Sequence, residues 1–438
     1  MKTGKNPRLE AVLYRLGRLY PRVIDLSLER SRRLLCALGR PESRLPPAVH
    51  IAGTNGKGST LAFLRAIAEA AGLSVHVYTS PHLVRFAERI RIAGRLLDDE
   101  GVADLLERVE RRNEGQEITF FEATTAAAML AFAETPADLC LIETGMGGRC
   151  DATNVLARPA LTLISSLSLD HKDFLGESLK AIAFEKTGIM KRGAPCLSVS
   201  QEEEAMAVIV AEAEKRGAPL RVEGRDWRID MSEEGVVFSA DGETLLLPPL
   251  ALPGRHQLEN AGLAIAAARV LADLPGLPKA LADPRRLAVG LENAVWPARL
   301  QRLRKGPLVD LSPEGWELWL DGGHNPGAGR ALAQQAADWS DRPLYLMAGM
   351  LNTKDARGFF APLAFASSLM RGVPIPGEEG SRTAEETALF ASEAGFADAR
   401  PAADLVAAMD EIRRNPGPAR ILICGSLHLA GVVLAENE

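Results

Sequence analysis

One stretch constrains this chain more than any other: the apolar residues 48–52 open directly into a loop that contains three glycines, a lysine and several hydroxyl side chains. Glycines let a backbone turn tightly and bring several N–H groups to one point, where a helix N-terminus adds partial positive charge. Apolar residues then recur at helical spacing from Leu61 onward. The stretch predicts a strand, a phosphate-binding loop and a helix. The loop residues are Gly53, Thr54, Asn55, Gly56, Lys57, Gly58, Ser59 and Thr60.

The side chains of this loop indicate how it would hold a nucleotide. Lys57 supplies a positive charge, and Ser59 or Thr60 offers a hydroxyl ligand to magnesium. The standard P-loop places serine or threonine directly after its lysine, whereas Gly58 follows Lys57 here. In this order the loop resembles the ATP loop of the Mur ligase superfamily, whose members join a carboxylate to an amino acid. A plain glycine-rich turn is the alternative, and the combination of strand, lysine, hydroxyls and helix disfavours it.

The composition of the chain excludes several classes of protein. A chain of 438 residues with 47% apolar and 25% charged residues is typical of a globular protein with two to three domains. Its net charge of -6 argues against a general nucleic-acid surface. No apolar run is long enough to span a bilayer, and residues 1–6 lack the apolar core of a signal peptide. Five scattered cysteines favour a reducing cytoplasm over a disulfide framework or a zinc site.

Two further apolar runs carry the argument for a metal. Residues 139–142 lead into Glu143 and a glycine-rich loop, and residues 161–167 lead toward His171. We expect Glu143 and His171 to lie at adjacent strand ends, facing Ser59 around a magnesium ion bound to nucleotide phosphate. Magnesium prefers oxygen ligands, which makes the imidazole the weaker part of this hypothesis. In the alternative, Glu143 caps the next helix and His171 is structural.

A predicted strand over residues 73–78 leads into Ser80, Pro81 and His82. The carboxyl ends of such strands are where open α/β sheets bind ligands, although a turn with an incidental histidine fits the local chemistry equally well. The three cations that follow, Arg85, Arg89 and Arg91, form either a solvated face or a contact for an anionic tail. The paired phenylalanines at 120 and 121 are on general grounds core residues.

The second part of the chain repeats the pattern of strand, polar glycine loop and helix. Residues 316–320, 344–348 and 421–424 read as strands, and each is followed by such a loop. We therefore predict an α/β fold: a mostly parallel P-loop-type sheet domain over residues 1–295, then a smaller Rossmann-like α/β domain over residues 296–438. The hinge is expected at residues 292–299.

At least seven blocks, in order along nearly the whole chain, resemble the folylpolyglutamate synthase and dihydrofolate synthase family of Mur ligases. They are residues 53–60, 79–83, 143–154, 169–176, 255–261, 321–326 and 425–428. Cys150, Thr187, Ala298 and the pair Asn352-Thr353 depart from the common family residues.

The resemblance implies roles for particular residues. ATP would contact the loop 53–60, Asn260, Arg299, Asp321 and His324. The folate or glutamate substrate would contact Ser80, Pro81, His82, Thr119, Phe121, Asp151 and Ala152. Metal ions would be held by Ser59, Glu143, His171 and Lys186, and the catalytic residues would be Lys57, Lys186, Arg299, His324 and Ser426.

The resemblance also implies an activity: an ATP- and magnesium-dependent ligase of folate biosynthesis and one-carbon metabolism. It would add L-glutamate to a carboxylate of reduced folate or dihydropteroate through an acyl phosphate. Two magnesium ions, a carbamylated Lys186 and a monomer are implied as well, and the sequence leaves open whether Lys186 is modified and which folate is preferred.

A peptidoglycan amino-acid ligase is the nearest alternative, but only 52 residues precede Gly53 where that class has a further domain. A GTPase switch would need a guanine-reading motif, and Asn352-Thr353-Lys354-Asp355 has the wrong order. A binding protein without catalysis is disfavoured by Lys57, Glu143, His171 and Lys186.

Overall fold

The computed structural model describes residues 6–19, 27–367 and 369–437. The ends of the two predicted domains, Met1 and Glu438, lie outside these residues. The chain divides into two compact units. Unit 1 comprises Met1–Leu167, Leu179–Leu250 and Glu259–Ala294, and unit 2 comprises Ser168–Ser178, Ala251–Leu258 and Val295–Glu438. Two short segments that lie within the sequence span of unit 1 thus pack with unit 2.

A mostly parallel sheet forms the centre of unit 1. Within the described residues eight strands pair in the order β4-β3-β2-β5-β1-β6-β7-β8. The pairs β2/β3 and β3/β4 are antiparallel, and the other pairs are parallel. The strands are β1 (Ala48–Ala52), β2 (Val75–Tyr78), β3 (Ile90–Ile92), β4 (Arg95–Leu96), β5 (Leu139–Glu143), β6 (Leu161–Ile164), β7 (Cys196–Ser198) and β8 (Leu220–Val222). All residues of β1, β2, β5 and β6 are buried, which explains their continuous apolar runs.

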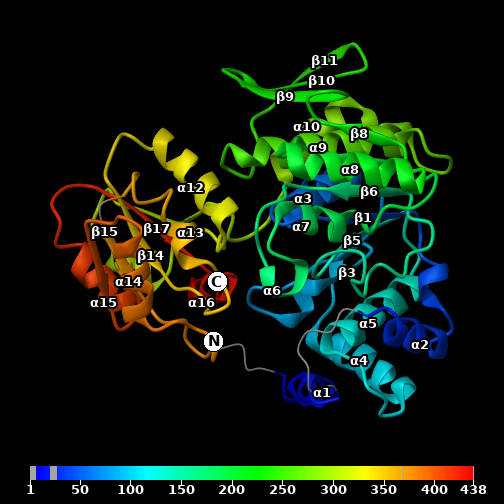
Figure 1. Cartoon of the computed structure of the whole chain (residues 1–438), viewed down its shortest axis with the longest axis horizontal. Helices are drawn as coiled ribbons and strands as arrows, with labels where there is room; N and C mark the ends of the chain where they lie inside the picture. Colours follow the sequence, from blue (N-terminus) through cyan, green and yellow to red (C-terminus); the bar gives the residue numbers. More distant parts are fainter. Residues whose placement is uncertain (1–5, 20–26, 368, 438) are drawn as a thin grey trace. The chain divides into compact units, whose positions relative to one another are not determined.

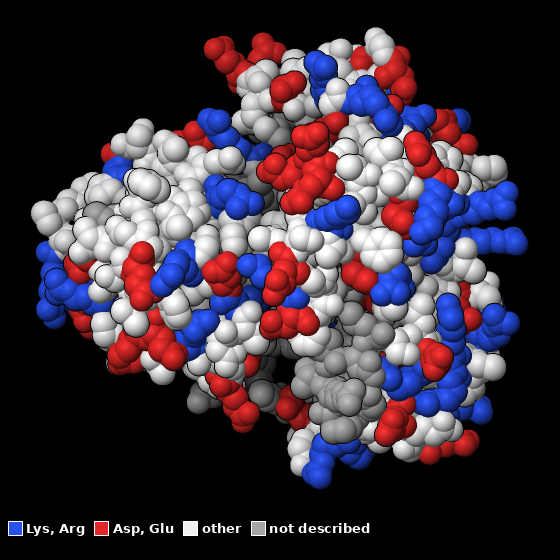
Figure 2. Space-filling model, viewed as in Figure 1, with Lys and Arg blue, Asp and Glu red and all other residues white. Residues whose placement is uncertain are grey.

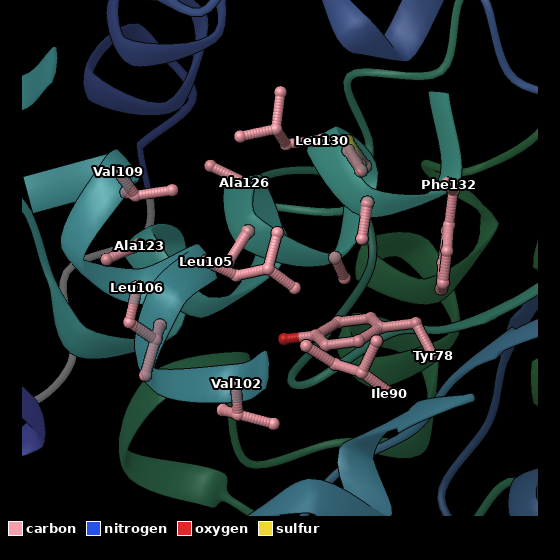
Figure 3. Close-up of a cluster of buried hydrophobic side chains, with 14 of the residues drawn as sticks. Tyr78, Ile90, Val102, Leu105, Leu106, Val109, Ala123, Ala126, Leu130 and Phe132 are labelled. Atoms are coloured by element: carbon pink, nitrogen blue, oxygen red, sulfur yellow. The ribbon is translucent and has the colours of Figure 1, made fainter. Parts of the chain in front are cut away.

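Helices cover this sheet, and α3 packs on α10 as α7 packs on α8 (Figure 1). The helices of unit 1 are α1 (Pro7–Gly17), α2 (Glu29–Ala37), α3 (Lys57–Ala70), α4 (Asp99–Asn113), α5 (Phe120–Glu134), α7 (Leu179–Thr187), α8 (Glu203–Arg216), α9 (His256–Ala272) and α10 (Pro284–Asn293). A large apolar cluster joins α1, α4 and α5 to β2 and β3. In Figure 3 the Tyr78 ring lies beside Ile90 in this cluster.

A small antiparallel sheet follows β8 and consists of β9 (Trp227–Ser232), β10 (Gly235–Ala240) and β11 (Glu243–Leu247). Its strands are joined by turns at residues 232–235 and 240–243. It lies beside α9 and α10 (Figure 1).

Unit 2 is built on a second sheet with the strand order β12-β13-β17-β14-β15-β16 among the described residues. Only β12/β13 is antiparallel. Its strands are β12 (Gln301–Leu303), β13 (Glu317–Leu320), β14 (Leu344–Ala348), β15 (Leu369–Gly372), β16 (Asp398–Pro401) and β17 (Arg420–Cys424). The helices are α6 (Lys172–Leu175), α11 (Pro307–Leu311), α12 (Pro326–Asp338), α13 (Ala356–Phe360), α14 (Ala384–Glu393), α15 (Leu405–Ile412) and α16 (Leu427–Asn437). The predicted α/β fold class with two mostly parallel sheets is confirmed.

One predicted detail of the topology is wrong. Strands β5 and β6 are not adjacent, because β1 lies between them and pairs with both. Strand β6 also ends at Ile164, so His171 lies beyond the strand end and not at it. His171 is separated from the strand because the residues after Ile164 support the phosphate loop: Ser165 Oγ donates to Asn55 O at 2.7 Å, and Ser166 O accepts from Thr54 N at 2.9 Å.

Candidate functional site

The predicted phosphate loop lies between β1 and α3, as expected. Gly56 is the N-cap of α3 and has a φ of 84°, a conformation that favours glycine. Among the described residues no side chain caps this helix, so the N–H groups of its first turn are directed out of the helix end. Lys57 Nζ folds back over the loop and donates to Gly53 O at 3.0 Å and to Thr54 O at 3.3 Å. The loop can therefore offer backbone donors and one ammonium group to an anion.

Two oxygen groups next to the loop suit a hard metal ion. Ser59 Oγ is buried and has no hydrogen-bond partner among the described residues, which is costly for a hydroxyl unless a ligand satisfies it. Glu143 ends β5, is buried, and lies with Oε1 3.8 Å from Lys57 Nζ. A hydroxyl and a carboxylate are the oxygen ligands that magnesium or manganese prefers, so these residues fit a divalent cation.

Lys186 lies beneath the same loop. Its side chain is buried on α7, and Nζ donates to Gly53 O at 2.8 Å. A carbamylated lysine retains one N–H and gains a carboxylate, so this hydrogen bond is compatible with the modification. The predicted residues Lys57, Lys186 and Gly53 are thus brought together.

The predicted substrate loop reaches the same place. Ser80 N donates to Glu143 Oε2 at 3.3 Å, so Glu143 contacts the substrate loop with one oxygen and faces Lys57 with the other. His82 Nδ1 accepts a hydrogen bond from Arg89 Nε at 2.9 Å. Pro81 is exposed beside them.

Phe121 lies against the glycine-rich loop after β5. A Cβ atom on Gly145 would be 2.3 Å from Phe121 Cζ, so only glycine allows this contact. Thr119 is the N-cap of α5, where its hydroxyl accepts from Glu122 N at 3.2 Å in a capping box. The structure thus gives Thr119 a helix-capping role and places Phe121 at the loop.

Asp151 and Ala152 are both buried. Burial raises the pKa of Asp151 despite its hydrogen bonds. Its carboxylate accepts from Met146 N at 2.7 Å and from Thr153 Oγ1 at 2.5 Å. Thr153 Oγ1 also lies 2.8 Å from His50 Nε2. Asp151 therefore shapes the loop that follows β5 and connects it to β1.

Asn260, on the first turns of α9, lies against the phosphate loop. Thr60 Oγ1 is 3.5 Å from Asn260 Oδ1, and a Cβ atom on Gly56 would be 2.1 Å from the same oxygen. The structure brings this residue to the loop from 200 positions away in the sequence.

Unit 2 gathers a second set of predicted residues at the carboxyl ends of β13 and β17, which are parallel neighbours. Asp321 is buried and accepts from Leu300 N at 2.9 Å and from Gly323 N at 2.7 Å. Arg299 contacts the same turn, since a Cβ atom on Gly322 would be 3.0 Å from its guanidinium. Ser426 is buried and its Oγ accepts from His428 N at 3.0 Å. Arg299, Asp321 and Ser426 thus lie on neighbouring loops.

His324 belongs to this set. Its Nδ1 lies 2.8 Å from Gly322 O, and because a carbonyl only accepts, Nδ1 carries the proton. Burial and the nearby Lys354 lower the pKa of His324 to about 4, so the ring is neutral near pH 7.

His171 belongs to unit 2 together with the rest of loop 168–178. Its neighbour Asp170 anchors this loop: Oδ1 accepts from Lys354 Nζ at 2.7 Å, and Oδ2 accepts from Asn325 Nδ2 at 3.1 Å. Burial opposes ionisation of Asp170, but Lys354, His171 and His324 hold its pKa well below the usual range. Within the described residues no group of three or more His, Cys, Asp or Glu side chains forms a metal cluster by itself.

Sequence reasoning missed several residues that hold these loops in place. Ser165 and Ser166 support the phosphate loop, and Asp170 and Lys354 anchor loop 168–178; Arg89 was named among three cations, but its contact with His82 was not predicted. Position in a motif could have indicated two of them, since Asp170 precedes His171 and Lys354 lies in the polar loop after β14.

Two further expectations concern a nucleic-acid-binding surface and a membrane-spanning helix. On the face shown in Figure 2, acidic and basic side chains are interspersed and do not separate into a basic face. In the part of the chain that the structure describes, no helix is both long and apolar enough to cross a membrane.

Comparisons with known proteins agree with this fold. Residues 51–268 match the model of the Mur ligase middle domain. The chain is 31% identical over 412 residues to the folylpolyglutamate synthase of Lacticaseibacillus casei, covering 91% of this chain and 92% of that protein. It resembles the structure of E. coli FolC in complex with DHPP and ADP, with a TM-score of 0.85, 30% identity and coverage of 97% and 96%. It also resembles a bifunctional folylpolyglutamate synthase/dihydrofolate synthase with Mn, AMPPNP and L-glutamate bound, with a TM-score of 0.83, 30% identity and coverage of 98% and 97%.

Proposed function

Because this chain belongs to the folylpolyglutamate synthase and dihydrofolate synthase family of Mur ligases, we propose that it joins L-glutamate to a carboxylate of dihydropteroate or a reduced folate. It is an ATP-dependent amide ligase that releases ADP and phosphate. The family membership favours this activity over peptidoglycan ligation. One observation carries the proposal: Glu143 faces Lys57 of the phosphate loop with one carboxylate oxygen and accepts from Ser80 of the substrate loop with the other.

The residues of unit 1 bind and orient the substrates in this proposal. The first-turn amides of α3 and Lys57 hold the nucleotide phosphates, and Asn260 supports the loop from α9. Ser80, His82 and Phe121 hold the pterin-containing substrate so that its carboxylate meets the terminal phosphate. Divalent cations, when bound, supply positive charge that offsets the charge of the transferring phosphoryl group. Ser59, Glu143 and Lys186, together with His171 of unit 2, are the residues proposed to hold them.

The chemical step is the attack of the substrate carboxylate on the terminal phosphate of ATP to give an acyl phosphate and ADP. The amine of L-glutamate then attacks the acyl carbon, an amide bond forms, and phosphate leaves. Arg299 is proposed to stabilise negative charge on the phosphoryl group, as preorganised cations do in other phosphoryl transfers. His324, neutral near pH 7, and Ser426 are proposed to contact the same reacting groups from unit 2.

Several finer assignments are part of the proposal. Residues 1–295 act as the ATP- and folate-binding domain and residues 296–438 as the ligase domain. Magnesium is the physiological cation with two ions per site, the protein acts as a monomer in the cytoplasm, and Lys186 is carbamylated. The modification is tested by ¹³C NMR of protein equilibrated with ¹³C-bicarbonate: a carbamate signal that is absent in Lys186→Arg supports it, and its absence from the unchanged protein contradicts it.

The activity is tested by glutamate-dependent release of phosphate from ATP and Mg²⁺, in parallel reactions with 7,8-dihydropteroate and with a tetrahydrofolate. Release with both substrates identifies a bifunctional enzyme, and release with one identifies a single activity. Release with neither, but with a muropeptide and a diamino acid, would contradict the folate assignment.

A further inference from the structure

Three arginines follow the substrate loop within seven residues, and the structure gives them different surroundings. Arg85 is exposed. Arg91 donates from NH1 to Gly94 O at 2.7 Å, which closes the β3/β4 turn. Arg89 alone turns toward the aromatic residues beside His82. The three arginines therefore do not form one common surface.

Arg89 is held firmly in this position. Its carbonyl accepts from Thr79 N at 3.1 Å, which fixes its backbone opposite the start of the substrate loop. Its guanidinium carbon lies 5.2 Å from the centre of the Phe86 ring and 6.0 Å from that of Phe120. Its Nε donates to His82 Nδ1 at 2.9 Å. The side chain is thus oriented before any substrate binds.

The nearest acidic residue in the sequence does not neutralise this cation. Both carboxylate oxygens of Glu88 accept from backbone N–H groups, those of Leu83, Val84 and Arg85, at 2.7 to 3.0 Å. Among the described residues no carboxylate lies within ion-pair distance of Arg89, and its terminal amino groups have no hydrogen-bond partner there. Burial lowers the pKa of Arg89, while Tyr78, Glu143 and Glu88 act in the opposite direction. A desolvated, preoriented guanidinium without an anionic partner is the kind of group that binds a carboxylate bidentately.

The contact with His82 also fixes that ring. A guanidinium Nε–H only donates, so His82 Nδ1 accepts and the ring proton lies on Nε2. His82 belongs to the loop that starts with Ser80, whose N–H contacts Glu143. Arg89 therefore contacts the loop whose first residue, Ser80, reaches Glu143.

We propose that Arg89 binds the carboxylate of the pterin-containing substrate that ATP phosphorylates, and that it orients His82 toward the same group. This inference rests on the proposed function. It adds a residue that binds the reacting carboxylate of the substrate and does not bind the pterin ring. It makes the acid itself, and not the pterin, the feature that Arg89 recognises.

The test compares two ligands with the full-length protein in the absence of ATP, using equilibrium binding by intrinsic fluorescence. One ligand is 7,8-dihydropteroate, and the other is its decarboxylated counterpart, in which aniline replaces p-aminobenzoate. Arg89→Met is expected to weaken dihydropteroate binding about tenfold or more and to change binding of the decarboxylated ligand less than about twofold. The matched control Arg85→Met, which removes an exposed arginine of the same segment, is expected to change neither.

Thermal unfolding establishes that each variant is folded. If Arg89→Met does not fold, the same ratio is measured with Arg89→Lys and Arg89→Gln, of which only the lysine variant is expected to keep part of the preference for the carboxylate ligand. Equal weakening of both ligands, or of neither, overturns the role of Arg89. If the unchanged protein binds neither ligand, the proposed function fails and this inference fails with it.

Discussion

Lys57 is the residue on which the phosphate loop depends most directly. Its ammonium group lies over the loop and 3.8 Å from Glu143. Lys57→Met keeps the length of the side chain and removes the charge, so we expect kcat for glutamate-dependent phosphate release to fall about 100- to 1000-fold. Lys180→Met, at an exposed position of α7, serves as the control and is expected to stay within about twofold of the unchanged protein. Equal rates for both variants would contradict the role of Lys57.

His50 makes stability depend on pH. It is buried in β1, and burial lowers its pKa from the ordinary 6.5 to about 3. Between these two values the unfolded chain binds a proton that the folded chain does not, so the neutral ring contributes stability above pH 6.5 that is lost as the pH falls toward 3. The expected loss from this one group is at most about 1.4 kcal/mol per pH unit.

His50→Gln keeps a donor for Thr153 and cannot titrate. We expect its free energy of unfolding, measured by urea titration from pH 7 to pH 4, to fall less steeply with pH than that of the unchanged protein. Identical slopes for the protein and His50→Gln would refute the assignment.

Single residues were predictable where neighbouring positions carry the chemistry. Glu143 ends the buried strand β5, Lys57 and Ser59 lie in the first turn of the helix after the buried strand β1, and the structure places them near one loop. The sequence could not show which of the three neighbouring arginines contacts His82. That depends on the pairing of β3 with β2, which a local pattern does not reveal. Ala298, which departs from the common family residue, has a φ of 55°, the left-handed conformation that favours glycine.

At the scale of elements, the start of α3 requires glycine for a reason that can be measured. Gly56 and Gly72 flank this helix with similar φ values of 84° and 88°. A Cβ atom at Gly56 would be 2.1 Å from Asn260 Oδ1, whereas at Gly72 nothing lies within 4 Å. Gly72→Ala should therefore lose about 1 kcal/mol of stability from the backbone alone, with ATP binding unchanged.

Gly56→Ala carries the same backbone cost and must also displace Asn260 from the loop. We expect its ATP affinity, measured by isothermal titration calorimetry, to fall about tenfold or more below that of Gly72→Ala. If both variants bind ATP equally well, the contact between Asn260 and the loop does not matter for the nucleotide.

Loop 168–178 is anchored to unit 2 by the ion pair of Asp170 and Lys354, whose side chains are only 11% and 10% exposed. Lys354→Met leaves a buried carboxylate without its cation, and we expect the unfolding free energy of unit 2 to fall by about 3 kcal/mol. Lys172→Met is the matched control, because Lys172 and Asp355 are 3.9 Å apart and both 42% exposed; its expected effect is below about 0.5 kcal/mol. The tryptophans Trp296, Trp316, Trp319 and Trp339 report the unfolding of unit 2. A loss in Lys354→Met as small as the control would contradict a buried anchor.

The sequence indicated most of the buried strands because continuous apolar runs identify them. The runs at 139–143 and 344–348 coincide with β5 and β14. It did not indicate the edge strands β12 and β16, where exposed and charged residues interrupt the apolar pattern. It also did not indicate β15, which is buried but only four residues long and contains the charged Arg371. Nor could it give the order of β5, β1 and β6, since that order depends on crossover connections and not on local pattern.

At the scale of the whole molecule, neither of the two compact units is a single continuous segment of the sequence. Ser168–Ser178 and Ala251–Leu258 pack with unit 2 although they interrupt unit 1. Local patterns cannot indicate this, because the anchor of the first segment joins Asp170 to Lys354 across 184 positions. The family, in contrast, was predictable, because its motifs occur in order along nearly the whole chain.

The central claim is that the chain activates a carboxylate as an acyl phosphate. The most direct test supplies dihydropteroate with ¹⁸O in its carboxylate, together with ATP, Mg²⁺ and L-glutamate, and determines the isotope content of the released phosphate by mass spectrometry. Attack of the carboxylate on ATP transfers one labelled oxygen to each phosphate, and we predict that result. Phosphate without ¹⁸O, released in step with amide formation, would contradict an acyl phosphate and with it the proposed reaction.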